Sequence, residues 1–424
     1  MRVKANPAIF VLLALVLVPT LVTGHKLFIR TVYVMVALIA LSFAWAWLNI
    51  RWLSGSRELR SNRSQVGGVI QERFLIGNKG PLPKLWVEMQ DHSGLAGYQA
   101  DRVLSSLPAH QERSWMLRAR CKRRGKFNFG PVTLVSGDPL GLFQVKRDVS
   151  LTSTLVVYPA TVDVPYFKAP IGRLSGGDAL QRQTQQITTN VSSVRDYMPG
   201  DSFNRIHWLS TARRSRLISK EFELDPLADI WLFVDMEEGV QAGTHADELV
   251  FDSVDAPYRV RSSLPLNPST EEYAATIAAS LAKHLLSQRR ALGMISYGQR
   301  REIVQVDRGE RQLVRFLESL AVVRAEGCVP MAEVIAAEGN QLGGGSTLIV
   351  ITPSTFGSWV GGLRDLKRKG IDVVAVHLEA STFGDAPSSL ETMASLAASN
   401  IPAYLVKNGV PLEESFAQRV EVGR

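Results

Sequence analysis

Two long uncharged apolar runs near the N-terminus constrain this chain more than any other feature of its sequence. Residues 7–23 read PAIFVLLALVLVPTLVT and residues 31–50 read TVYVMVALIALSFAWAWLNI. Twenty helical residues rise about 30 Å, which matches the hydrocarbon core of a bilayer. The connection His25–Arg30 is long enough only for a tight turn. We therefore predict a transmembrane helical hairpin within residues 1–54.

The residues that flank these runs predict their orientation. Three tryptophans gather at the end of the second run, where indole rings favour the headgroup layer. The outer ends of the runs carry more basic residues than the turn between them, which holds only Lys26 and Arg30. The positive-inside rule then places both termini on the cytoplasmic side. The alternative is a secretory signal in the first run, but Leu21–Gly24 is a poor small-residue cleavage site. The three tryptophans are Trp45, Trp47 and Trp52. The basic residues at the outer ends of the runs are Arg2, Lys4, Arg51, Arg57, Arg60 and Arg63.

Basic residues are concentrated just after the second run. The 424-residue chain has a formal net charge of +8, and residues 51–150 hold 17 basic and 8 acidic side chains. This surplus of nine can serve solubility alone, and beside a membrane it can also bind anionic headgroups. Nucleic acid is the rival partner for such charge, but the sequence has no RNA- or DNA-binding motif and we expect no nucleic-acid binding.

The two cysteines, Cys121 and Cys328, exclude a zinc ribbon and a disulfide-rich scaffold, because neither has a partner at ligand spacing. We expect both to be free and buried, with a single disulfide as the alternative. Free thiols fit a cytoplasmic location.

Residues 55–160 predict a β-rich, sandwich-like domain. Short runs of alternating apolar and polar residues recur about every ten positions and are separated by turn residues. The dense basic run Arg118–Arg124 is expected mostly on a solvated face, where charges protect a strand edge. Asp138-Pro139-Leu140-Gly141 predicts a tight turn before a buried Leu142-Phe143.

Residues 161–225 lose this periodicity and predict a connecting arm followed by a segment of mixed charge. Six bases and five acids alternate after residue 194, so one interpretation is an ion-paired belt that docks the arm on the next domain. The alternative is that Arg213, Arg214 and Arg216 bind a carboxylate or phosphate of a partner. Trp208 is expected to be buried, and His207 to be a core histidine. The charged residues are Arg195, Arg205, Arg213, Arg214, Arg216 and Lys220, and Asp196, Asp201, Glu221, Glu223 and Asp225.

This segment resembles a bacterial family known as domain of unknown function 58, whose members are membrane-anchored. The family pattern Arg-x-Tyr-x-Pro-Gly-Asp, then Arg-x-Ile-Asp-Trp and Ala-Arg, is matched except at His207, where the family has Asp. Upstream, Arg124-Gly125, Gly130-Pro131, Asp138–Phe143 and Tyr158-Pro159 also fit. The matching signature residues are Arg195, Tyr197, Pro199, Gly200, Asp201, Arg205, Ile206, Trp208, Ala212 and Arg213.

Residues 226–424 predict a doubly wound α/β domain. The buried strand 228–236 ends at Asp235, and amphipathic helices then alternate with apolar strands to the C-terminus. In such sheets ligands bind at the carboxyl ends of the strands, so Asp235 falls on the ligand edge. The whole chain is thus expected to be an α+β multidomain protein.

The resemblance implies a von Willebrand factor A-like fold for this C-terminal half. Such domains hold Mg²⁺ through Asp-x-Ser-x-Ser, a Thr and a later Asp, which supply hard oxygen ligands. Here Asp235 stays while both serines are lost, and Thr352-Pro353-Ser354 lacks the later Asp. Glu237 and Glu238 could replace lost ligands or form a solvated loop. We expect no metal and no cofactor, with Asp235 as the weak candidate ligand, and an acidic insertion over residues 237–268 suited to a basic partner.

The sequence contains no phosphate loop, nucleophile elbow or zinc-protease motif, so we expect no enzymatic activity and identify no small-molecule substrate. The resemblance implies a scaffold in the bacterial inner membrane that acts with a MoxR-type AAA+ ATPase in assembling or maturing envelope complexes. We expect that partner to bind the signature segment or the acidic insertion. The alternatives are a metal-dependent hydrolase or transferase at Asp235, and a module that senses anionic lipid.

Overall fold

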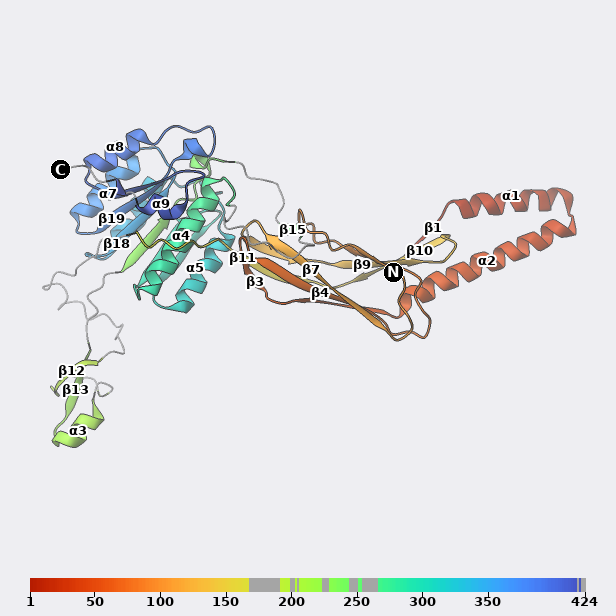
Figure 1. Cartoon of the computed structure of the whole chain (residues 1–424), viewed down its shortest axis with the longest axis horizontal. Helices are drawn as coiled ribbons and strands as arrows, with labels where there is room; N and C mark the ends of the chain where they lie inside the picture. The colour runs from red at the N-terminus through yellow and green to blue at the C-terminus, as the bar shows by residue number, and fades with distance from the viewer. Residues whose placement is uncertain are drawn as a thin grey trace. The chain divides into compact units, whose positions relative to one another are not determined.

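A computed structural model of the chain describes residues 1–167, 191–198, 203, 206–222, 229–243, 251–253, 266–417 and 419–420 (Figure 1). The chain forms two compact units, which we describe separately. The N-terminal unit comprises residues 1–160 and 245–267, with residues 320–322. The C-terminal unit comprises residues 161–244, 268–319 and 323–424.

Two apolar helices begin the N-terminal unit after the short strand β1 (Arg2–Ala5). Helix α1 (Ala8–Thr23) ends at Gly24, which has the left-handed φ of +58°. Helix α2 (Lys26–Arg51) starts at once, because the His25 side chain accepts a hydrogen bond from the Leu27 N–H at 3.2 Å. The two helices contact each other near the turn that joins them and diverge toward the sheet (Figure 1). By length and composition α2 can span a membrane, whereas the apolar part of α1 is shorter, so the transmembrane hairpin stays a prediction.

Three sheets surround one hydrophobic core in the N-terminal unit. Inward-facing residues alternate along the strands, as Ile70, Phe74 and Ile76 do on β4. The pairs are antiparallel except β3 with β11. The first sheet has, in spatial order, β1, β10 (Phe143–Val149), β9 (Val132–Gly137), β5 (Val87–Asp91) and β6 (Arg102–Leu104). The second has β15 (Phe251–Ser253), β7 (Glu112–Cys121), β4 (Val69–Asn78) and β2 (Leu53–Leu59). The third has β3 (Arg63–Gln65), β11 (Ser153–Tyr158) and β8 (Gly125–Phe129).

Two expectations are corrected, one about an arginine of this unit and one about a cysteine of the C-terminal unit. Arg118 is exposed, but Arg124 at the other end of the basic run is fully buried, because the chain reverses between β7 and β8 and turns this side chain inward. Cys121 is buried as expected. Cys328 is exposed, because it lies in the loop that precedes α6 and outside the strand pattern.

The C-terminal unit is built on a seven-stranded sheet whose five central strands are parallel. These strands are buried on both faces, which explains their continuous apolar sequence. The two edge strands, β17 and β21, are antiparallel. In spatial order the strands are β17 (Arg301–Asp307), β16 (Leu292–Tyr297), β14 (Ile230–Val234), β18 (Thr347–Thr352), β19 (Asp372–Leu378), β20 (Ala403–Val406) and β21 (Arg419–Val420).

Helices cover both faces of this sheet. Trp359 and Leu363 of α7, with residues of α6 and α8, join one core cluster with Phe233 and Val350. Helix α4 packs on β14, β16 and β18 through other residues, so the sheet is doubly wound as predicted. The helices are α4 (Thr270–Ser287), α5 (Glu310–Val322), α6 (Met331–Glu338), α7 (Ser358–Arg368), α8 (Leu390–Ala398) and α9 (Leu412–Ala417), with short 3₁₀ turns at Glu238–Val240, Gly339–Gln341 and Ala380–Thr382.

Candidate functional site

The signature segment folds into a small ribbon-and-helix element. Strands β12 (Val191–Asp196) and β13 (Ile218–Phe222) pair antiparallel, and α3 (Trp208–Arg214) lies between them in sequence. The Tyr197 N–H donates to the Leu217 carbonyl at 2.9 Å, and the His207 N–H donates to the Ile218 carbonyl at 2.8 Å. Ile206 and Ile218 are buried, so they hold the helix against the ribbon.

His207 has a specific structural role that sequence reasoning missed. Its Nδ1 accepts a hydrogen bond from the Ser210 N–H at 3.2 Å and lies 2.7 Å from the Ser210 hydroxyl. This is the position of an N-cap, where Asp is among the preferred residues because its oxygen binds the same free N–H groups. The imidazole therefore takes the capping role that an aspartate of the family pattern would have. His207 is half-buried and is no core histidine.

The outer surface of this element is apolar. Trp208 and Leu209 on α3 are 66 % and 62 % exposed, and Met198, Phe203 and Leu217 are exposed beside the ribbon. The expectation that Trp208 is buried is therefore wrong. Helix α3 has only two turns and buries its neighbours Ile206 and Ile218 rather than residues of its own. These large exposed side chains on one element make it a candidate interaction surface.

The described arginines of the signature segment are of two kinds, free and paired with Asp196. Arg213 and Arg214 are exposed in the last turn of α3, and neither forms an ion pair within the described residues. Arg216 pairs with Asp196 at 2.9 Å, and Arg195 donates to the Asp196 carbonyl at 3.2 Å. The ion-paired belt thus holds in part. Pro199, Gly200, Asp201 and Arg205 lie outside the described residues, as do Glu223 and Asp225.

Asp235 lies where the sequence predicted, at the carboxyl end of β14. The spatial order of the sheet reverses between β14 and β18, which is the position at which doubly wound sheets bind ligands. Here, however, the Asp235 carboxylate is buried and engaged. The Thr352 hydroxyl donates to its Oδ2 at 2.5 Å, and the Glu237 N–H donates to its Oδ1 at 3.1 Å. Gln241 closes the loop by donating to the Asp235 carbonyl at 3.3 Å.

Burial shifts the protonation of this edge. Loss of hydration raises the pKa of Asp235 to about 6, with the hydrogen bond from Thr352 opposing the shift. His377 on β19 lies opposite Thr352 in the register, is fully buried, and has no hydrogen-bond partner on either ring nitrogen within the described residues. Burial lowers the pKa of His377 to about 4. The edge therefore holds a weakened acid after β14 and a neutral imidazole on β19, with β18 between them.

Within the described part of the chain, no three Asp, Glu, His or Cys side chains are grouped so as to hold an ion. Burial and the charge of Glu333 raise the pKa of Glu237. The acidic insertion over residues 237–268 lies largely outside the described residues. Its strand β15 pairs with β7 of the N-terminal unit.

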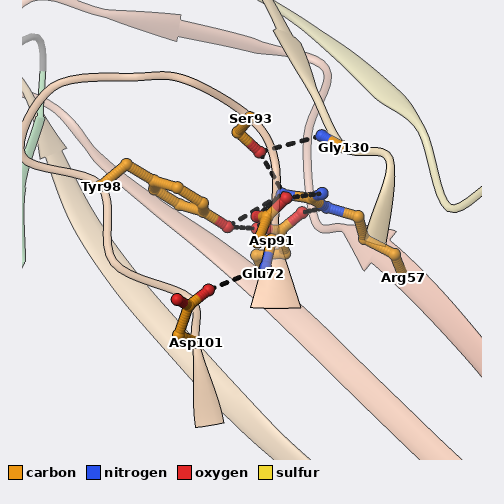
Figure 2. Close-up of polar contacts among 7 residues, drawn as sticks. All are labelled: Arg57, Glu72, Asp91, Ser93, Tyr98, Asp101 and Gly130. Atoms are coloured by element: carbon orange, nitrogen blue, oxygen red, sulfur yellow. Dashed lines mark hydrogen bonds and ion pairs between the residues drawn. The ribbon is translucent and has the colours of Figure 1, made fainter. Parts of the chain in front are cut away.

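A buried ionic cluster in the N-terminal unit escaped the sequence analysis (Figure 2). The Arg57 guanidinium on β2 forms a salt bridge with Glu72 and another with Asp91 at 3.1 Å, and all three side chains are nearly inaccessible. The Tyr98 hydroxyl donates to Glu72, and Phe74 and Phe129 lie against the cation. A sequence signal existed, because Glu72 occupies an inward position of an otherwise apolar β4 pattern.

The loop over this cluster lines an open pocket of about 520 Å³. Its lining includes Asp91, Ser93, Tyr98 and Asp101. These polar groups already bind one another: Ser93 donates to Asp91 at 2.7 Å, and Asp101 accepts from the Asp91 N–H at 2.7 Å (Figure 2). We therefore regard the cluster as part of the core that fixes the β5–β6 loop.

Comparison with known proteins finds a family match on the signature segment. Residues 193–250 match the family described as "Protein of unknown function DUF58". The chain is also 22 % identical over 295 residues to "Uncharacterized protein YeaD" of Bacillus subtilis strain 168, across 68 % of this chain and 67 % of that protein.

Likenesses to solved structures are weak. The CARDB domain of the PF1109 protein from Pyrococcus furiosus has a TM-score of 0.18 and 9 % identity, covering 25 % of this chain and 86 % of that one. The pilus adhesin SpaC from Lactobacillus rhamnosus GG has a TM-score of 0.29 and 10 % identity, covering 45 % and 28 %. These scores are too low to assign a fold or a function.

Proposed function

We propose that this protein is a membrane-tethered, non-enzymatic adaptor that binds a protein partner through the signature segment. The observation that carries the proposal is the exposed Trp208 and Leu209 on α3, with Arg213 and Arg214 at their edge. This surface lies within the residues that match the family. We call these four residues the α3 surface.

The chemistry of the α3 surface favours one kind of partner. Buried Trp and Arg are the residues that most often dominate the energy of protein interfaces. A partner therefore needs an apolar pocket for Trp208 with carboxylates beside it to receive the two guanidinium groups. In keeping with the family resemblance, we propose a MoxR-type AAA+ ATPase as this partner, in the assembly or maturation of bacterial envelope complexes.

The proposed tether is the pair of helices α1 and α2. Strand β1 precedes α1 and pairs with β10, while the end of α2 leads into β2 of the same unit. Both ends of the helical pair are thereby held in one folded unit, which has to lie on one side of a bilayer. Together with the positive-inside rule, this supports a cytoplasmic location for both termini at the bacterial inner membrane.

We further propose that the C-terminal unit is a von Willebrand factor A-like domain whose ligand edge no longer binds an ion. Asp235 is retained, but its two oxygens serve Thr352 and the Glu237 N–H. The edge then acts as a rigid frame. The described residues offer no observation in support of a metal-dependent hydrolase or transferase at Asp235.

The decisive experiment is a crosslinking pull-down from native membranes with the full chain. We expect wild type to recover an AAA+ ATPase, and the variants Trp208→Ala/Leu209→Ala and Arg213→Glu/Arg214→Glu each to lose most of it. Removing one such anchor typically costs about 2 kcal/mol or more, which is at least tenfold in affinity.

Matched controls carry the same changes at exposed positions elsewhere. Leu390→Ala removes an exposed leucine of α8, and Arg311→Glu reverses an exposed charge on α5. Unchanged recovery with all four α3-surface substitutions would show that the partner binds elsewhere. Absence of any ATPase from the wild-type sample would contradict the proposed partner.

A further inference from the structure

The turn over residues 138–143 has a feature that its architectural role does not explain. The buried Asp138 shapes the turn, since its carboxylate accepts hydrogen bonds from the Leu140 N–H at 2.9 Å and the Phe143 N–H at 2.6 Å. Gly141 supplies the left-handed φ of +70°. These hydrogen bonds hold the turn in a conformation in which Leu140, at its tip, is 58 % exposed.

This turn lies at the base of the apolar helices. The Asn6 N–H donates to the Leu142 carbonyl at 2.8 Å, and the Asn6 side chain accepts from the first N–H of α1 at 3.1 Å. On the other helix, Phe43 of α2 meets Phe143 edge to face at 5.6 Å. The turn is therefore fixed at the level where both helices leave the sheet (Figure 1).

The packing of α2 on the sheet determines the point at which the two helices leave it. Its last three turns pack on β9 and β10 through Ser42, Ala46 and Asn49, and Asn49 donates to the Ser136 hydroxyl at 2.6 Å. The apolar residues before position 42 are mostly exposed. Sixteen residues of α1, and the sixteen residues of α2 before the docked part, therefore rise about 24 Å clear of the sheet. Because this is less than a bilayer core of about 30 Å, the sheet is drawn against the membrane surface.

The strand beside the turn carries unmatched positive charge. Arg2 on β1 lies directly opposite Lys146 on β10, and Lys4 lies on the same face as Arg2. Like charges directly opposite one another destabilise a strand pair unless an anion lies between them. Among the described residues none of these three side chains has an ion-pair partner.

We infer that the 138–143 turn and the β1–β10 edge form a lipid-contact surface. Leu140 inserts into the interfacial layer, and Arg2, Lys4 and Lys146 bind the phosphates of anionic lipids. The inference rests on the proposed membrane anchoring and adds what the cytoplasmic unit contacts. Such a surface would fix the orientation of the sheets against the membrane.

The test uses the full chain reconstituted in vesicles. Leu140→Cys, in a Cys328→Ser background, is labelled with an environment-sensitive fluorophore, and quenching by lipid spin-labelled near the headgroup is measured. Asn62→Cys is the matched control, because Asn62 is exposed beyond the far end of β2. We expect strong quenching at position 140 and little at position 62 in vesicles that contain phosphatidylglycerol.

Charge variants test the headgroup contact. In Arg2→Gln/Lys4→Gln/Lys146→Gln, we expect the phosphatidylglycerol content needed for half-maximal quenching to rise several-fold, since each basic residue near the surface strengthens binding about fivefold. High salt should have the same effect on wild type.

The experiments distinguish an error in the proposed lipid-contact surface from an error in the proposed membrane anchoring. If alkaline extraction leaves the chain in the membrane while position 140 is quenched no more than position 62, the lipid-contact surface is wrong and the anchor stands. Equal quenching in purely zwitterionic vesicles would overturn the binding of anionic phosphates. Release of the chain by alkaline extraction would overturn the anchor and this inference together.

Discussion

Individual side chains in this protein take roles that depend on neighbours far from them in sequence. His207 caps α3, a role that a histidine in a charged segment does not reveal. Arg57 belongs to a row of arginines that the positive-inside rule counts as flanking charge, yet its side chain is buried between Glu72 and Asp91. A guanidinium so enclosed is not available to lipid, so residue type alone overstates the basic surface.

Two buried groups at the sheet edge predict opposite pH dependences. Asp235 titrates near 3.8 when unfolded and has a folded pKa of about 6, so from about pH 4 to 6 the folded chain keeps a proton that the unfolded chain has lost. Rising pH therefore lowers the free energy of unfolding over this range. His377 has a pKa of 6.5 when unfolded and about 4 when folded, so between these pH values the unfolded chain holds a proton that the folded chain has lost. Rising pH therefore raises the free energy of unfolding over about pH 4 to 6.5. Each effect is about 3 kcal/mol, so they nearly cancel.

Single substitutions should separate the two opposite changes of the free energy of unfolding with pH. Relative to wild type, Asp235→Asn should make the C-terminal unit gain stability as pH rises from about 4.5 to 6.5, and His377→Leu should make it lose stability. Hydrogen exchange of β14, β18 and β19 amides, corrected for intrinsic rates, measures both. Parallel profiles for the two variants and wild type would show that neither group titrates differently on folding.

At the scale of elements, α2 is one helix with two environments. Its first part is apolar and exposed, while its last three turns are part of the N-terminal core. The predicted second membrane span, residues 31–50, includes both parts because the sequence stays apolar across the junction between them. The buried spacing of Ser42, Ala46 and Asn49 follows the helical period, which places these small and polar residues on the face against the sheet.

Asn49→Ala tests how firmly the junction holds. The substitution removes the hydrogen bonds to the Ser136 hydroxyl and the Gly137 carbonyl, a loss of about 1–3 kcal/mol locally. We expect faster hydrogen exchange over residues 46–51 and unchanged exchange over residues 26–41. Ser42→Ala, two turns nearer the free end, is the control that keeps these bonds. Equal exchange in wild type and Asn49→Ala would mean that apolar packing alone fixes the helix.

At the scale of the whole molecule, the proposed topology predicts labelling from opposite sides. The exposed Cys328 should react with a membrane-impermeant maleimide only after permeabilisation of cells, because the proposed topology places the C-terminal unit in the cytoplasm. A cysteine at His25, in the turn between α1 and α2, should react from outside in intact cells. Cys121 is buried and should stay unreactive in both. Reaction of both sites from the same side would exclude a hairpin that crosses the bilayer.

Much of the architecture is predictable because it follows local patterns. Period-two runs became strands, the apolar strands after residue 226 became a parallel sheet covered on both faces, and Asp235 lies at its predicted edge. The candidate site was predicted less well. Trp208 is exposed and Arg124 is buried, since the packing partner of a side chain depends on which elements meet in three dimensions.

The sequence by itself determined the apolar helices, the order of strands and helices, and the family match on the signature segment, because each depends on residues adjacent in the chain. Only the tertiary structure decided which charged and aromatic side chains are free to act. Burial, cross-strand register and hydrogen-bond partners join residues as far apart as Asp235 and Thr352, and no local pattern records those pairings.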